Sequence, residues 1–311
     1  MTTTLPRSQP AGRLVVPRGG RVARGRAVPL ALVAPALLFY AVVVLYPTVA
    51  GGLYAFTDWT GQRTTPNVVG LDNFAELLSS PPARAALANT LVIAVCTTVV
   101  QTVIGLALAL ALHSRLASRH VLRTLFFAPA LLPPVIIGFL WQYVLTPEGP
   151  LNGALTAAGL DALTRNWLGD SSLALPAVIA VIIWQNTGLT MVIYLAGLQG
   201  VPAELLEAAE IDGAGRWQRL RHVTIPMLLP ATTIATSLTL IGSLKLFDQV
   251  YVMTGGGPGY ATETLSVVMY KEAFVSGRYG YSAAIALVLT MIVFALALVQ
   301  LRGLRRYEVQ P

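Results

Sequence analysis

Long uncharged apolar runs, separated by short polar segments, recur along the whole chain. A helix that crosses a bilayer needs about 20 predominantly apolar residues. Runs of sufficient length predict six membrane-spanning helices, at residues 28–57, 85–112, 124–147, 171–203, 224–244 and 279–301. The expected fold class is therefore all-α, a polytopic membrane protein with six transmembrane helices.

The composition agrees with a bilayer as the solvent. Of the 311 residues, 55% are hydrophobic and 11% are charged, with a mean hydropathy of +0.67, whereas soluble domains carry about a quarter charged residues. The net charge of +7 could suggest a nucleic-acid partner, but six arginines lie within residues 1–27. Membrane orientation explains this basic tail, which is predicted to be disordered, so no nucleic-acid partner is expected.

The distribution of basic residues predicts the orientation, because cytoplasmic loops near the spans carry the Lys and Arg excess. The tail at 1–27 and the C-terminal tail at 302–311 are both basic, and both are predicted to be cytoplasmic. Outer segments 58–84 and 148–170 carry more acids than bases. The first apolar run is too long for a signal peptide and is expected to be retained. Residues 28–301 are thus expected to form one six-span domain in the cell (inner, cytoplasmic) membrane.

A charged segment interrupts the apolar pattern between the fourth and fifth runs. Residues 207–230 read EAAEIDGAGRWQRLRHVTIPMLLP. Pro202 suits the first turn of a helix, Gly213 and Gly215 break that helix, and Trp217 begins a second one. The pattern predicts a helix–turn–helix on the cytoplasmic surface, within a loop over about 200–226. Lipid headgroups are one possible surface for it, but its acids and paired alanines favour docking into another protein.

The order Glu-Ala-Ala, Asp-Gly-Ala, Ile225-Pro226 and Pro230 in this loop resembles the EAA loop of ABC importer permeases. In that family the loop is a cytoplasmic coupling helix that sits in a cleft of the ATPase subunit. The resemblance implies a type I ABC importer permease fold. It assigns ATPase coupling to Glu207, Ala208, Ala209, Asp212, Gly213 and Ala214.

Two further segments extend the resemblance over nearly the whole chain after the tail. Residues 70–74 (GLDNF) and 246–258 (LFDQVYVMTGGGP) are similar to segments of the maltose and glycerol-3-phosphate class, in the first of its two permeases. The resemblance implies a binding-protein-dependent importer of a sugar, oligosaccharide or polyol. It also implies three kinds of partner: a second related permease in a heterodimer, two cytoplasmic ATP-binding subunits, and an extracytoplasmic solute-binding protein.

Polar residues within spans mark pathways, because an unpaired polar group in hydrocarbon is costly. The segment 184–187 (WQNT) is the densest polar group in the fourth span, and similar permeases use the residues after this Trp in the solute cavity. Interhelical hydrogen bonding and small-residue packing are the alternative. The pathway candidates in the fourth and fifth spans are Gln185, Asn186, Thr239, Gly242 and Ser243.

Three local features add expectations. Lys245 and Asp248 have the i, i+3 spacing of a charge pair on one helix face, with direct solute contact as the alternative. Prolines at 129, 133 and 134 should kink the third span. Glycines between Thr254 and Gly259 predict an aqueous turn, after which Thr262-Glu263-Thr264 should cap another helix.

No residue pattern indicates catalysis. The three histidines stand at predicted cytoplasmic edges without Cys or carboxylates at metal-ligand spacing, and the sequence contains no phosphate-loop motif. We expect no catalytic residue, metal or cofactor, and ATP hydrolysis in a separate subunit. A secondary transporter would need ionisable residues within its spans, and the first four predicted spans have none. An intramembrane enzyme would need a nucleophile or metal ligands within the bilayer, and no such arrangement is found. A non-catalytic membrane scaffold would explain the spans but not the EAA loop.

Overall fold

The computed structural model describes residues 30–62, 65–114 and 117–305. The predicted N-terminal tail at 1–27 and the last residues of the predicted C-terminal tail, 306–311, lie outside them. The described residues are helical, with a single isolated antiparallel bridge between Thr57 and Val68. The all-α prediction is confirmed.

The first span is one continuous apolar helix. Helix α1 (Leu30–Tyr40) passes through a π-helical turn (Ala41–Leu45) into α2 (Tyr46–Tyr54). The stretch Val33–Tyr54 has a mean hydropathy of 2.0, and no side chain in its most apolar window is buried. Its described residues up to Val49 belong to a unit separate from the one that begins at Ala50. The exposed apolar surface of this helix is predicted to face lipid or a partner protein.

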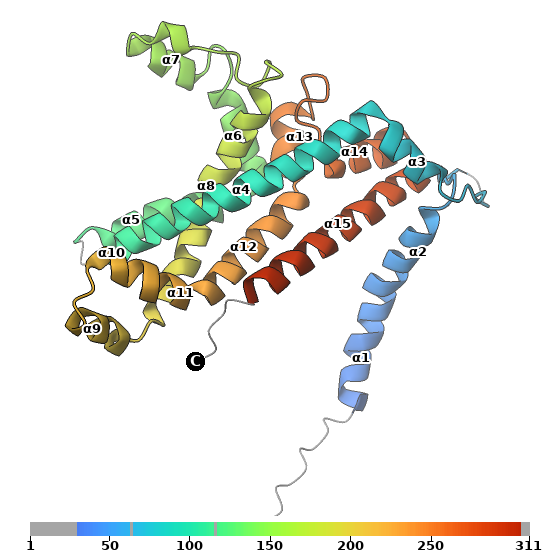
Figure 1. The fold of residues 1–311 in the computed structure, drawn as a ribbon. Coiled ribbons are helices and arrows are strands. Elements are labelled where there is room, and N and C mark those ends of the chain that lie inside the picture. Colours follow the sequence, from blue (N-terminus) through green and yellow to red (C-terminus); the bar gives the residue numbers. More distant parts are fainter. Residues whose placement is uncertain (1–29, 63–64, 115–116, 306–311) are drawn as a thin grey trace, which may run out of the picture. The chain divides into compact units, whose positions relative to one another are not determined.

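Four long helices organise residues 50–311. They are α4 (Pro81–His113), α8 (Ala174–Gln199), α12 (Leu229–Leu244) and α15 (Tyr279–Arg305). Helix α4 packs along α8 and α12, and α12 packs on α15 (Figure 1). Helix α15 continues to Arg305, beyond the predicted end of the sixth span at Leu301. Together with the first span, α4, α8 and α15 are long and apolar enough to cross a membrane.

The third span is broken, as its prolines predict. Helix α5 (Arg119–Phe127) and a 3-10 turn (Ala128–Leu131) meet α6 (Pro134–Val144) at 98°. Proline has no backbone N–H and cannot continue the ladder of helical hydrogen bonds. The predicted kink is confirmed.

The fifth span starts later than predicted. Helix α10 (Arg216–Arg219), a π-helical turn (Leu220–Thr224) and α11 (Ile225–Met227) run together and meet α12 at 64°. The prediction that this span begins at Thr224 is wrong, because the chain turns at Leu228, just before Pro230. If each bent pair is one span, the described residues contain up to six.

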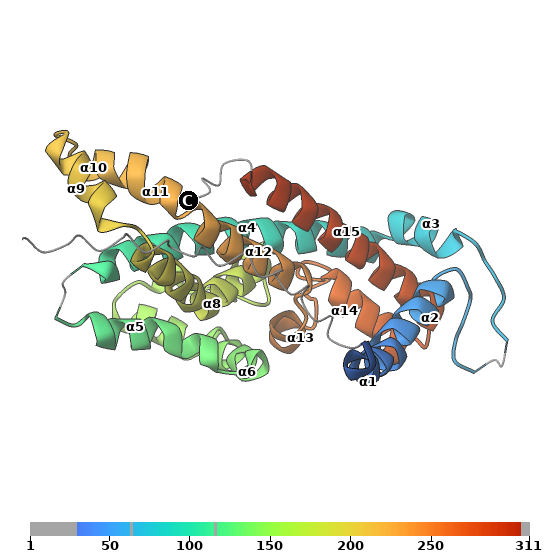
Figure 2. The ribbon, with the colours of Figure 1, turned by 90° about the horizontal axis from the view of Figure 1, so that it is seen from below.

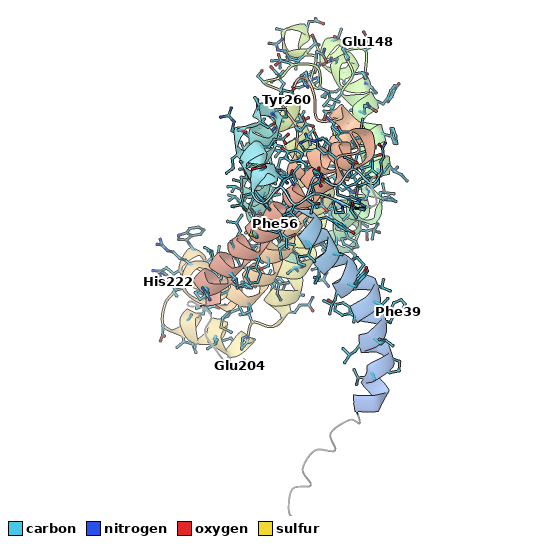
Figure 3. All side chains as sticks on the ribbon, turned by 90° about the vertical axis from the view of Figure 1, so that its right-hand side faces the viewer. Phe39, Phe56, Glu148, Glu204, His222 and Tyr260 are labelled. Atoms are coloured by element: carbon cyan, nitrogen blue, oxygen red, sulfur yellow. The ribbon has the colours of Figure 1, made fainter. Side chains whose placement is uncertain are left out.

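The short helices gather at the two ends of this unit. Figures 1 and 2 show α9 (Ala203–Ile211), α10 and α11 beside one end of α4 and α3 (Asp72–Ser79) beside the other. Glu204 and His222 lie at one end and Glu148 and Tyr260 at the opposite end (Figure 3). The latter end also holds α7 (Pro150–Ala157), a 3-10 turn (Asp161–Leu163), α13 (Asp248–Thr254), α14 (Leu265–Tyr270) and the π-helical turn Lys271–Val275.

Candidate functional site

The turn between α9 and α10 has the geometry of a helix C-cap closed by glycine. Gly213 has φ +81°, and its N–H donates to the Glu210 carbonyl over 3.0 Å. The N–H of Ala214 donates to the Ala209 carbonyl over 2.9 Å. These two bonds form the Schellman motif, which requires a left-handed residue that glycine supplies without a Cβ penalty.

Side chains also connect the two helices. Arg219 pairs with Glu210 over 2.5 Å, and Oε1 of Gln218 accepts from the Gly215 N–H over 2.8 Å. A surface ion pair contributes only about 0–1 kcal/mol, so the glycine turn contributes more to the angle between the helices. Between them lies a hollow of about 340 Å³, lined in part by Ala209, Asp212, Gly213 and Ala214.

The predicted coupling residues all belong to this surface. Glu207, Ala208, Asp212 and Gly213 are exposed, and Ala209 and Ala214 are half-buried at the turn. Beside them, the Ile211 side chain is 87% exposed and that of Trp217 is 69% exposed. Large apolar side chains left uncovered on a polar segment are typical of a surface that another protein covers. Coupling to an ATPase stays a prediction.

A cavity of about 290 Å³ lies between α8 and α12. Asn186, Thr239, Gly242 and Ser243 line it, so four of the five predicted pathway residues come together here. Gln101 of α4 and Pro134 of α6 add further walls. The role of these residues in transport stays a prediction.

Gln185 lies behind the cavity wall. Its side chain is buried, its Nε2 donates to the Leu132 carbonyl over 3.0 Å, and its Oε1 accepts from Nε2 of Gln249 over 2.9 Å. Gln249 itself lines the cavity. The structure therefore connects Gln185 to the cavity through Gln249.

Ser243 also bonds to a neighbouring helix. The Thr97 hydroxyl donates to its Oγ over 2.7 Å, and both side chains are buried. This contact fastens α4 to α12 at the cavity wall. Ser243 therefore forms an interhelical hydrogen bond, which was the alternative to a role in solute contact.

Lys245 and Asp248 do not share a helix face, and that prediction is wrong. Helix α12 ends at Leu244 and α13 begins at Asp248, with Phe247 outside the helical region at φ −129° and ψ −57°. The described residues contain no ion pair between the two side chains. Both instead line the cavity, the position that the alternative of direct solute contact requires.

The glycine-rich segment after α13 turns as predicted. Gly255, Gly256 and Gly259 have φ of +60°, +93° and +61°. The hydroxyls of Thr254 and Thr262 bond to each other over 2.7 Å across the turn. The segment is thus a folded loop.

Two groups hold this loop on the helices around it. Nδ2 of Asn89, on α4, donates to the carbonyls of Tyr260 and Glu263, both over 3.0 Å. The buried Glu263 carboxylate pairs with Nζ of Lys271 over 2.6 Å. The Thr264 hydroxyl accepts from the Val267 N–H over 3.4 Å and caps α14, which confirms the predicted helix start.

No group of three or more His, Cys, Asp or Glu side chains that could hold a metal ion occurs within residues 30–62, 65–114 and 117–305. The single Cys96 is half-buried and free. The described residues thus combine up to six candidate spans with a cavity between α8 and α12 and an exposed helical turn at one end, an arrangement that a membrane permease requires.

The particular family follows from comparison with known proteins. Residues 101–306 match the family described as "Binding-protein-dependent transport system inner membrane component". The chain belongs to this family, and it is a multi-pass inner-membrane permease subunit of a binding-protein-dependent ABC importer.

Known proteins are similar to this chain over most of its length. The "Probable ABC transporter permease protein YurN" of Bacillus subtilis is 37% identical, over 90% of this chain and 97% of its own. The "Multiple sugar-binding transport system permease protein MsmF" of Streptococcus mutans is 34% identical, over 88% and 93%. A chain of the crystal structure of a bacterial ABC transporter that imports alginate has a TM-score of 0.78 at 23% identity, covering 89% of this chain and 94% of that chain. At this level of sequence identity, the structural similarity shows the fold alone.

Proposed function

We propose that this chain is one of two related permeases in an ATP-driven importer of a sugar, oligosaccharide or polyol. The relative from Streptococcus mutans is named for multiple sugars, and others are named for starch degradation products and for diacetylchitobiose. In this proposal the chain supplies half of the translocation pathway. Two cytoplasmic ATP-binding subunits supply the energy, and an extracytoplasmic binding protein delivers the solute.

The observation that carries the coupling role is the exposed surface of α9 and its turn. Glu207 and Ala208 face away from the rest of the chain, next to the hollow at Gly213. From there α10 and α11 run directly to the bend at Leu228 and into α12, which carries the cavity residues. A movement imposed on α9 by closing ATPases would therefore reach the cavity through one short path. Closure opens the cavity outward, and hydrolysis resets it.

The surface of α12 beside the cavity supports the proposal of a second permease. On α12, Ile234 and Leu238 are exposed beside Thr239 and Gly242. Exposed apolar side chains beside the polar positions of the cavity can pack on a related helix and leave those polar positions facing a shared pathway. A second, related permease in a heterodimer would close the open side.

The proposed orientation places both termini in the cytoplasm. The end of α15 at Arg305 lies in the half of the unit that also holds α11 (Figure 1). Basic residues near span ends favour the cytoplasmic side. The coupling turn and the C-terminal end would then meet the ATPases on the same side.

Ala208→Arg in the reconstituted complex tests this function. A bulky charged side chain at an exposed, small docking position should prevent the ATP-binding subunits from co-purifying and abolish the ATPase stimulation by solute-loaded binding protein. Ala154→Arg is the matched control, because Ala154 is an exposed alanine on α7 at the opposite end. Unchanged assembly and stimulation in Ala208→Arg would reject the coupling role, provided that the wild type is stimulated.

A further inference from the structure

A second hollow adjoins the solute cavity. It has a volume of about 560 Å³ and lies among α14, the π-helical turn after it, α15 and the link between α12 and α13. Lys245 and Phe247 line both this hollow and the cavity. The two spaces are therefore neighbours across a single short segment of chain.

Four aromatic rings form a connected group along this boundary. Phe247 stacks on Tyr251 with centroids 5.1 Å apart and planes at 17°. Tyr270 contacts both rings, at 5.1 and 5.0 Å, and Phe274 extends the group from Tyr270 at 5.2 Å. We call these residues, Phe247, Tyr251, Tyr270 and Phe274, the aromatic ledge.

The ledge is only partly covered by the chain. The Phe274 side chain is 71% exposed and that of Tyr251 is 38% exposed. Aromatic rings are among the largest apolar groups and dominate cores when they are buried. Rings that contact one another but keep exposed surface beside two hollows are available to a ligand.

The hollow beside the ledge is lined mainly by apolar surface, with Lys245, Ser266 and Ser282 as polar side chains at its edges. A pyranose presents C–H groups on its faces and hydroxyls on its rim. The faces can lie on the electron-rich faces of the rings, while the rim hydroxyls need polar partners. Lys245 lies at both hollows and Asp248 at the cavity, without an ion pair between them within the described residues. Lys245 at the boundary and Asp248 in the cavity are the charged groups that can bond these hydroxyls.

We propose that the aromatic ledge is a second saccharide subsite, adjoining the cavity between α8 and α12 across Lys245 and Phe247. An oligosaccharide would place one unit in the cavity and the next unit against Tyr270 and Phe274, with Phe247 between them. This inference rests on the proposed function as a carbohydrate importer. It makes the permease a selector of chain length, which favours solutes of two or more sugar units.

The test uses the complete reconstituted complex with its binding protein. A panel of mono- to tetrasaccharides of glucose, xylose and N-acetylglucosamine first identifies those that wild type imports. Uptake per ATP hydrolysed is then measured, at saturating loaded binding protein, for Phe274→Ala, Tyr270→Ala and Phe274→Trp. Val275→Ala is the matched control, because Val275 is the adjacent side chain, is 74% exposed and lies outside the ledge.

We expect Phe274→Ala and Tyr270→Ala to lower the uptake of di-, tri- and tetrasaccharides about three- to tenfold, the range of a lost aromatic contact, while monosaccharide uptake and stimulated ATP hydrolysis are retained. Phe274→Trp, which keeps an aromatic ring at this position, should keep uptake near the wild-type level. Val275→Ala should match wild type. Equal uptake in all variants, or an equal loss for all chain lengths, would overturn the subsite. Loss of the second permease from the alanine variants would show that the hollow is a subunit interface instead. Failure of the proposed function would appear separately, as a wild-type complex that imports no saccharide in the panel.

Discussion

Gln185 and Gln249 are buried against each other, with Nε2 of Gln249 donating to Oε1 of Gln185 over 2.9 Å. Gln185 uses its own Nε2 on the Leu132 carbonyl, at the break of the third span. One side-chain pair thus joins α8, α13 and the broken third span at the wall of the cavity.

A double-mutant cycle tests this pair. Gln249→Leu should lower the free energy of unfolding by about 1–3 kcal/mol, because it leaves a buried amide oxygen without its donor. Gln185→Leu should cost more, since it also removes the donor to Leu132. The double variant should be less destabilised than the sum of the single ones. The measurement is unfolding of the purified protein in detergent, followed by tryptophan fluorescence; strict additivity would show that the pair is not coupled.

Two helical glycines should respond oppositely to the same substitution. A Cβ at Gly188 would collide with the Phe126 backbone carbonyl, so Gly188→Ala should destabilise by about 1–3 kcal/mol. A Cβ at Gly242 meets nothing within 4 Å, so Gly242→Ala should leave stability equal or raise it by roughly 0.5–1 kcal/mol. Thermal unfolding of the two variants checks this, and equal effects at both sites would contradict the close packing of α8 on α5.

The left-handed turn at Gly213 makes a prediction about coupling. Gly213→Val should reduce stimulated ATPase activity by roughly five- to thirtyfold, because a left-handed conformation costs a residue with a Cβ about 1–2 kcal/mol. Asparagine tolerates this conformation better, so Gly213→Asn should retain most of the activity. The measurement is ATP hydrolysis with and without loaded binding protein. Equal losses in the two variants would point to side-chain bulk rather than to the turn.

The cavity residues can be tested separately from packing. Asn186→Ala and Thr239→Val should each reduce solute uptake about two- to tenfold, the range of one hydrogen bond, with little effect on assembly. Thr187→Val is the control, since Thr187 follows Asn186 on α8 but does not line the cavity. If the control loses as much uptake as the cavity variants, the polar groups of α8 serve helix packing.

The sequence predicts the parts of this fold that depend on local chemistry. The lengths of the apolar runs give the spans, prolines give the 98° break before α6, and Gly213 gives the turn after α9. Each of these follows from a few consecutive residues and their backbone preferences.

The parts that depend on distant partners were not predicted. The segment Lys245–Phe247 contains no glycine or proline, yet it interrupts the helix, and the Leu246 carbonyl accepts from the Thr264 hydroxyl 18 residues further on. The late start of α12 is hidden because the residues on both sides of Leu228 are apolar. The connection of Gln185 to Gln249 joins side chains 64 residues apart, a distance at which no periodicity carries information.

The bond from Gln185 to the Leu132 carbonyl has a consequence for biogenesis. The third span leaves the ribosome before the helix that carries Gln185, and the Leu132 carbonyl, which lies in extended backbone at the break before Pro134, is costly in hydrocarbon until it has a donor. The third span therefore cannot be completed in lipid as it is synthesised. It has to remain beside the insertion machinery or in contact with water until the fourth span arrives, so these two spans are expected to enter the bilayer as a pair.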